Sequence, residues 1–156
     1  MKADYLFPAV MKKVGYVMFI IFMVPSLLYI SGHFPTDFLN AKTFAIIGGG
    51  IFGKTTYFSI ITNDLSDELL FIGLSLSLLF ISFSREKDED ECISKIRMQS
   101  LMWALKVNTL LIILISLFVY GEPYLSFMVS FIFTVYIMFI IKFNIALHKF
   151  RANDEK

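Results

Sequence analysis

Eight consecutive residues match the pattern of a phosphate-binding loop. The stretch Gly48–Thr55 reads GGGIFGKT, which fits G-x-x-x-x-G-K-[ST]. In nucleoside triphosphatases the backbone amides of such a loop cradle phosphates, while its lysine contacts them and its hydroxyl binds magnesium. The preceding TFAII, residues 43–47, has the composition of the strand that such a loop follows. The pattern therefore raises nucleotide hydrolysis as a hypothesis.

A second candidate is the pair Lys106 and Asn108, which lies inside a long apolar run. A charge within a membrane span is costly unless it pairs or reaches the interface, and it is a functional candidate by default. Lys106 follows Arg97 by only about two to three helical turns, so its long stem can carry the ammonium to the interface. We predict snorkelling or a structural ion pair for Lys106, with a transport or ligand role as the alternative.

The most polar stretch is Arg85–Arg97, which carries nine charged residues. It lacks the glycine and the ligand spacing of a calcium-binding loop, so we expect its opposite charges to pair at i,i+4 on a solvated helix start. His33, His148 and the single Cys92 are isolated and suggest no metal site. No catalytic triad, paired catalytic carboxylates or nucleophile motif can be assembled. The sequence therefore predicts no catalytic residue, no metal, no cofactor and no enzyme.

Composition indicates a membrane protein. The chain is 57% hydrophobic and 17% charged, and its mean hydropathy is +0.72, whereas soluble domains average about 45–50% and 25%. The net charge of +1 provides no field that attracts nucleic acid. We therefore expect the lipid bilayer as a partner and no nucleic acid.

The apolar runs predict an all-α polytopic membrane protein with four transmembrane helices in one domain, residues 1–156. The first run, Val14–Ile30, has 17 residues without a charge, just enough to cross a core of about 30 Å. Pro25 within it should loosen or kink the helix about a turn earlier. Asn63 or Ser66 can cap the second helix, and the third should begin near Asp88. The predicted helices cover about 12–31, 66–84, 88–120 and 123–150.

The segment 41–62 is harder to assign. Its apolar part, Thr43–Gly53, has only 11 residues, which is too short to span and suits a re-entrant, interfacial or packed element. A phosphate loop also needs a covered parallel sheet, and the residues needed to build one are committed to membrane helices. We therefore predict no nucleotide binding at Gly48–Thr55.

Lys and Arg residues predict the orientation. They gather at the N-terminus, in the loop between the second and third helices, and at the C-terminal end. The region between the first and second helices has only Lys42 and Lys54, and the last turn has none. Both termini are therefore expected in the cytoplasm, and residues 41–62 on the far side.

The run Phe80–Asn108 resembles an uncharacterised family of small bacterial four-helix integral membrane proteins, often encoded beside helix-turn-helix repressors. The matching elements are Ser84–Lys87, Asp90 with Glu91, Ile93 with Ile96 and Arg97, and Ser100 with Leu101, Trp103 and Ala104. The stretches LFP, KKVG and NDLSDEL also look similar. The resemblance implies the architecture and a place in the bacterial inner membrane, but no mechanism. GGGIFGKT is not part of the family pattern.

Three function classes follow from these observations. The first, which we favour, is a non-enzymatic accessory or regulatory membrane protein that docks another protein through its charged cytoplasmic hairpin. The second is a small oligomeric channel or transporter, and the third is a membrane enzyme. A protein partner or a homo-oligomer fits the first two classes. The candidate interaction surface consists of Arg85, Lys87, Asp90, Glu91, Lys95 and Arg97.

Overall fold

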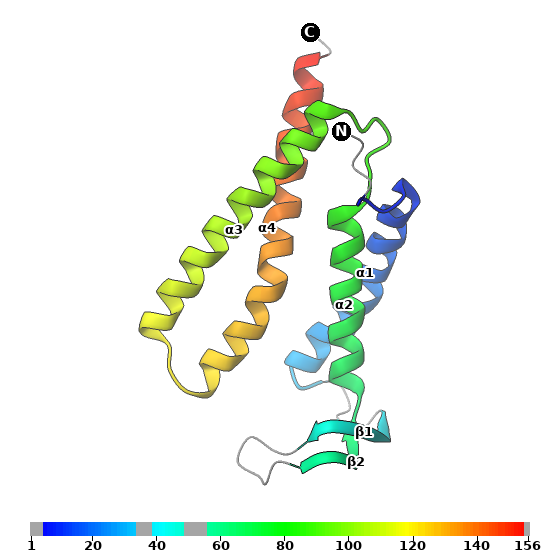
Figure 1. Cartoon of the computed structure of the whole chain (residues 1–156), viewed down its shortest axis with the longest axis vertical. Helices are drawn as coiled ribbons and strands as arrows, with labels where there is room; N and C mark the ends of the chain where they lie inside the picture. The colour runs from blue at the N-terminus through cyan, green and yellow to red at the C-terminus, as the bar shows by residue number, and fades with distance from the viewer. Residues whose placement is uncertain (1–4, 34–38, 49–55, 155–156) are drawn as a thin grey trace. The chain divides into compact units, whose positions relative to one another are not determined.

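The computed structural model describes residues 5–33, 39–48 and 56–154. Its elements are α1 (Ala9–Ile30), β1 (Asn40–Gly48), β2 (Thr56–Asp64), α2 (Ser66–Phe83), α3 (Glu91–Phe118) and α4 (Glu122–Asp154), as Figure 1 shows. The four helices lie where the apolar runs predicted them. The largest differences in their ends are the start of α1, three residues earlier than expected, the start of α3, three residues later, and the end of α4, four residues later.

All four helices are long and apolar enough to cross a membrane. Large apolar side chains are exposed along them, as expected of helices that face lipid instead of water. Examples are Ile20, Ile21 and Leu27 on α1, Leu110, Ile113 and Leu117 on α3, and Ile132, Ile137 and Ile141 on α4. The chain is therefore a mostly helical, multi-pass membrane protein, and its described residues also form a β-hairpin.

The chain divides into two compact units, one formed by Met18–Leu74 and the other by Met1–Val17 with Ser75–Lys156. The first of these contains the hairpin, in which β1 and β2 pair antiparallel from Asn40↔Asp64 to Gly48↔Thr56. Both strands are rich in β-branched and aromatic residues, which favour strands. The hairpin accounts for the segment that the sequence left open as re-entrant, interfacial or packed.

Two local features complete the Met18–Leu74 unit. Asp64 Oδ1 accepts hydrogen bonds from Ser66 Oγ at 2.6 Å and Ser66 N at 3.1 Å, which lower the pKa of this carboxyl below its usual value. The side chain of Asp64 thus accepts at the start of α2, and the predicted cap Ser66 is a donor to it; the side chain of Asn63, the other predicted cap, lies outside the described part of the chain. Within the same unit α2 packs closely on α1, because a Cβ at Gly73 would lie 2.4 Å from the Phe22 ring.

In the other unit α3 and α4 lie side by side and form the main core (Figure 1). Ile93 and Ala104 pack with Phe139, Phe143 and Leu147 in one buried cluster. Phe139 and Phe143 stack with ring centroids 5.8 Å apart. The fully buried Ala104 leaves room for the two helices to approach.

The N-terminal segment of this unit is fastened to the end of α2. Phe7 N donates to Phe83 O and Arg85 N donates to Phe7 O, both at 2.9 Å, forming a parallel bridge. A Cβ at Gly15 would lie 2.9 Å from Ile81 Cγ1 and 3.0 Å from Ile81 N. The first turns of α1 therefore pack backbone-close against the last turns of α2.

Candidate functional site

The charged residues of Arg85–Arg97 belong to the connection between α2 and α3 and to the first turns of α3. The structure separates them into two groups. Glu86, Glu89 and Arg97 turn into the protein, whereas Arg85, Lys87, Asp88, Asp90, Glu91 and Lys95 are exposed.

Arg97 is buried, with only 7% of its surface exposed. Its Nη2 lies 2.8 Å from Glu89 Oε2, and its Nη1 donates to Ser82 O at 3.0 Å. Its guanidinium carbon lies 4.6 Å from the centre of the Phe143 ring, within range of a cation–π contact. One side chain thus connects the end of α2, the loop, α3 and α4.

This position corrects the prediction that Arg97 belongs to an exposed interaction surface with i,i+4 pairing. Arg97 falls on the buried stripe of α3, which also contains Ile93, Ser100, Ala104 and Asn108. These residues recur every three or four positions, so they share one helix face, and that face packs against α4. The same periodicity is visible in the sequence and was the available signal for the burial of Arg97.

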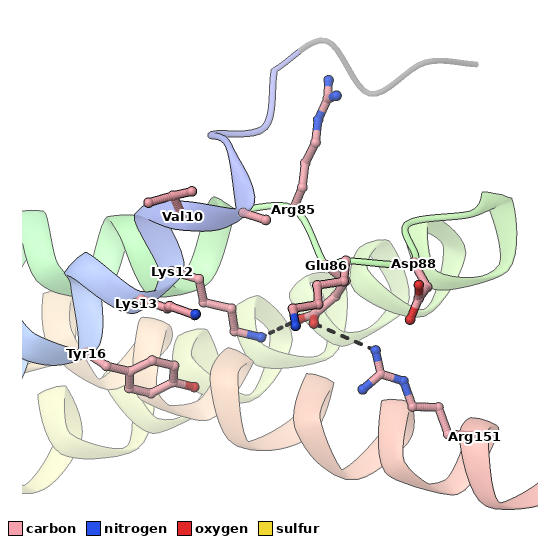
Figure 2. Close-up of a pocket in the computed structure, with 10 residues that line it drawn as sticks. Val10, Lys12, Lys13, Tyr16, Arg85, Glu86, Asp88 and Arg151 are labelled. Atoms are coloured by element: carbon pink, nitrogen blue, oxygen red, sulfur yellow. Dashed lines mark hydrogen bonds and ion pairs between the residues drawn. The ribbon is translucent and has the colours of Figure 1, made fainter.

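Glu86 is the second internal carboxylate of the loop (Figure 2). Its Oε1 pairs with Lys12 Nζ from the start of α1, and its Oε2 lies 3.8 Å from Arg151 Nη2 near the end of α4. Figure 2 shows the two cations on opposite sides of the carboxylate, joined to it by dashed lines. Glu86 therefore links two segments that are far apart in the chain.

Asp90 is the N-cap of α3. Its backbone is extended, with φ −119° and ψ −178°, and its Oδ1 accepts from Ile93 N at 2.7 Å. This satisfies one of the free amides in the first turn. The helix consequently begins at Glu91 instead of near Asp88, and Asp90 has a structural role in addition to its exposure.

The exposed charged residues lie on the α2–α3 loop and the first turns of α3, and the internal contacts of Glu86, Glu89 and Arg97 hold this backbone in place. Lys87, Glu91 and Lys95 are exposed, as is Arg85, whose side chain extends away from the Glu86 ion pairs in Figure 2. Backbone contacts at Arg85 N and a hydrogen bond from Glu86 N to Glu89 Oε2 at 2.8 Å fix the loop at both ends. Four of the six predicted surface residues, Arg85, Lys87, Glu91 and Lys95, thus lie exposed on or beside the anchored loop.

Lys106 and Asn108 are placed differently, although they are only two positions apart. Lys106 is exposed, while Asn108 is 8% exposed on the buried stripe of α3. Its Oδ1 has no hydrogen-bond partner among the described residues. The aromatic Trp103 nearby contacts Lys142 of α4, whose Nζ lies 5.0 Å from the ring centre. The structure therefore does not bring Lys106 and Asn108 together as one site.

A cavity of about 430 Å³ opens beside Glu86 (Figure 2). Its polar lining comes from α1, the loop and the end of α4, and Ala9, Val10 and Tyr16 provide an apolar wall. A second cavity of about 400 Å³ lies against His148 and Asn144 of α4. Lys12, Glu86 and Arg151 border both cavities. The ion-paired residues Lys12, Glu86 and Arg151 therefore form a wall that the two cavities share.

The phosphate-loop pattern falls mostly outside the described residues, which stop at Gly48 and resume at Thr56. The described part shows β1 followed by the antiparallel strand β2, whereas a phosphate loop leads from a strand into a helix. Across residues 5–33, 39–48 and 56–154, no three His, Cys, Asp or Glu residues are grouped to hold a metal ion.

Comparison of the chain with protein-family models, curated proteins and solved structures finds no match.

Proposed function

We propose that this multi-pass membrane protein is a non-enzymatic accessory or regulatory protein of the bacterial inner membrane, with both termini in the cytoplasm. In this proposal another protein docks on the exposed charges around the α2–α3 loop. The resemblance of Phe80–Asn108 to the family of small four-helix membrane proteins, which we retain as a proposal, covers the same region. The orientation is supported by the Lys and Arg counts of the loops.

The observation that carries the proposal is the anchoring of the loop. The buried ion pair between Glu89 and Arg97 fixes the loop to α3. The ion pairs of Glu86 with Lys12 and Arg151 fix it to α1 and α4. A surface that is already ordered loses less conformational entropy when a partner binds. Lys87, Glu91 and Lys95 consequently form a preorganised pattern of both charge signs, which favours one partner over others through complementarity.

A small oligomeric channel or transporter is the alternative. Lys106 favours it, because an exposed lysine within α3 must snorkel, pair with another chain or face water. The buried Asn108 follows two residues later. The mass of the purified protein in detergent distinguishes the two proposals, since a closed ring of several copies supports the channel and a single copy with a bound protein supports docking.

The docking proposal is tested by a charge-neutral double variant. Glu91→Gln with Lys95→Gln removes one charge of each sign from exposed positions and leaves Arg97, Glu89 and Glu86 in place. The matched control, Lys42→Gln with Asp67→Asn, removes the same charges from exposed positions of the Met18–Leu74 unit. We expect the first variant to lose the protein that co-purifies with the wild type, and the control to retain it.

Membrane insertion is measured in parallel for all three proteins. Normal insertion is expected throughout, because exposed ion pairs stabilise a fold by only about 0–1 kcal/mol each. Retention of the partner by the Glu91→Gln, Lys95→Gln protein at the wild-type level contradicts the docking proposal, as does equal loss in the control.

A further inference from the structure

We propose that the cavity beside Glu86 binds the phosphate of an anionic lipid headgroup. This ligand site shares Arg85 and Lys87 with the protein-docking surface, but it does not depend on a docked partner. It follows from three properties of the cavity: an excess of cations, an apolar wall, and its place at the start of a membrane span.

The cavity lining is strongly cationic. Its charged residues are five cations and two carboxylates, a net charge of +3: Lys12, Lys13, Arg85, Lys87 and Arg151 against Glu86 and Asp88. Glu86 is already paired on both of its oxygens. Among the lining residues, the exposed Asp88 is the carboxylate that remains to offset Lys13 and Lys87, so the cavity attracts an anion.

Lys13 and Lys87 are the two lysines of the cavity that do not pair with Glu86, so they can contact a ligand. Both are exposed and both line the cavity. They come from different segments, α1 and the α2–α3 loop, which the pairing of Lys12 with Glu86 brings together. Two exposed lysines that line one cavity suit a phosphate, which accepts several charge-assisted hydrogen bonds.

The other lining residues point to a lipid as the source of the phosphate. Ala9, Val10 and Tyr16 form the apolar wall of the cavity. Lys13 is followed directly by the uncharged run Val14–Ile30, so the cavity lies where a span meets its headgroup layer. Tyrosines are enriched at this level of a membrane, and basic pockets between transmembrane helices hold anionic headgroups. The volume of about 430 Å³ is in the range of ligand pockets.

The test uses the purified full chain in neutral detergent, titrated with phosphatidylglycerol and followed by native mass spectrometry. Phosphatidylcholine is the zwitterionic control lipid, and glycerol 3-phosphate is the soluble phosphate. The test variant is Lys13→Gln with Lys87→Gln. The matched control is Lys95→Gln with Lys149→Gln, which removes two exposed lysines that do not line the cavity. Both variants leave Lys12, Glu86 and Arg151 intact.

We expect saturable binding of phosphatidylglycerol and none of phosphatidylcholine. The Lys13→Gln, Lys87→Gln change should weaken phosphatidylglycerol binding by roughly tenfold or more, because juxtamembrane lysines each contribute to the attraction of anionic lipid. The control variant should bind within about twofold of the wild type. Glycerol 3-phosphate should not displace the lipid at comparable concentrations.

Two results overturn the inference. Equal weakening in both variants, or none in either, shows that the lysines of the cavity do not form a site. Displacement by glycerol 3-phosphate at concentrations comparable with those of the lipid shows that the ligand is a soluble phosphate compound, which rejects the lipid assignment.

Discussion

Arg97 and Glu89 form a buried ion pair across the start of α3, with 2.8 Å between Nη2 and Oε2. Neither side chain exposes more than 14% of its surface. Arg97 Nε and Glu89 Oε1 have no hydrogen-bond partner in the described part of the chain. The pair is therefore costly to build and still more costly to break, because removal of one member leaves the other charge buried alone.

Replacing Arg97 by methionine should destabilise the protein by about 3–5 kcal/mol, because Glu89 loses its counter-charge in a buried position. The measurement is the free energy of unfolding in detergent micelles. The double variant Arg97→Met with Glu89→Gln should recover part of the loss, since no unpaired charge then remains.

Lys95→Met is the matched control for this change, because Lys95 is exposed two residues earlier on the same helix. It should alter stability by no more than about 0.5 kcal/mol. Equal effects of Lys95→Met and Arg97→Met contradict the burial of Arg97.

Asp88 and Asp90 look alike in the sequence, but Asp90 is the one that caps α3. Asp90→Ala removes the acceptor of the Ile93 amide and should cost about 0.5–2 kcal/mol of stability. Asp88→Ala should cost less than about 0.5 kcal/mol, since Asp88 is exposed and precedes the cap. Thermal unfolding of the two variants, measured side by side, compares the two losses of stability. A larger loss for Asp88→Ala than for Asp90→Ala would place the start of α3 near Asp88, as the sequence alone suggested.

Gly15 lies where the first turns of α1 contact the last turns of α2. Both of these segments belong to the unit formed by Met1–Val17 with Ser75–Lys156. Gly15→Ala places a Cβ 3.0 Å from the backbone nitrogen of Ile81, which cannot be relieved by a side-chain rotation. We expect a loss of about 1–3 kcal/mol from overpacking. Val17→Leu adds volume at an exposed position of the same helix and should be nearly neutral. If both substitutions are neutral in the unfolding measurement, the close approach does not exist.

The single Cys92 is exposed at the start of α3 and reports the orientation without any added tag. A membrane-impermeant maleimide should label it only after the membrane is opened, because the positive-inside counts predict that this loop is cytoplasmic. In a Cys92→Ser background, Thr62→Cys on β2 should instead be labelled in intact spheroplasts. Labelling of Cys92 in intact spheroplasts reverses the proposed orientation, and Cys92→Ser alone checks that the signal is specific.

The sequence by itself determined the four membrane helices. Length and apolarity are sufficient for this, because a bilayer leaves a chain of about 20 apolar residues almost no alternative to a helix. The same rule explains why segment 41–62 stayed open: 11 apolar residues are too few to span, and short apolar runs suit strand and helix alike. Pairing of β1 with β2 decides it, and the pairing is a contact between two segments that the periodicity of either segment alone does not reveal.

The charged residues also divide between what the sequence and what the tertiary structure determined. The sequence located them at Arg85–Arg97, and the spacing of Ile93, Arg97 and Ala104 carried the signal that Arg97 is internal. Only the tertiary structure decided which charges pair, since Glu86 takes Lys12 and Arg151 from opposite ends of the chain. Such partners are interchangeable in a sequence, where every lysine and arginine is an equal candidate. Packing of α3 on α4 and of α1 on α2 makes the choice, because it brings these particular side chains within reach of the same carboxylate.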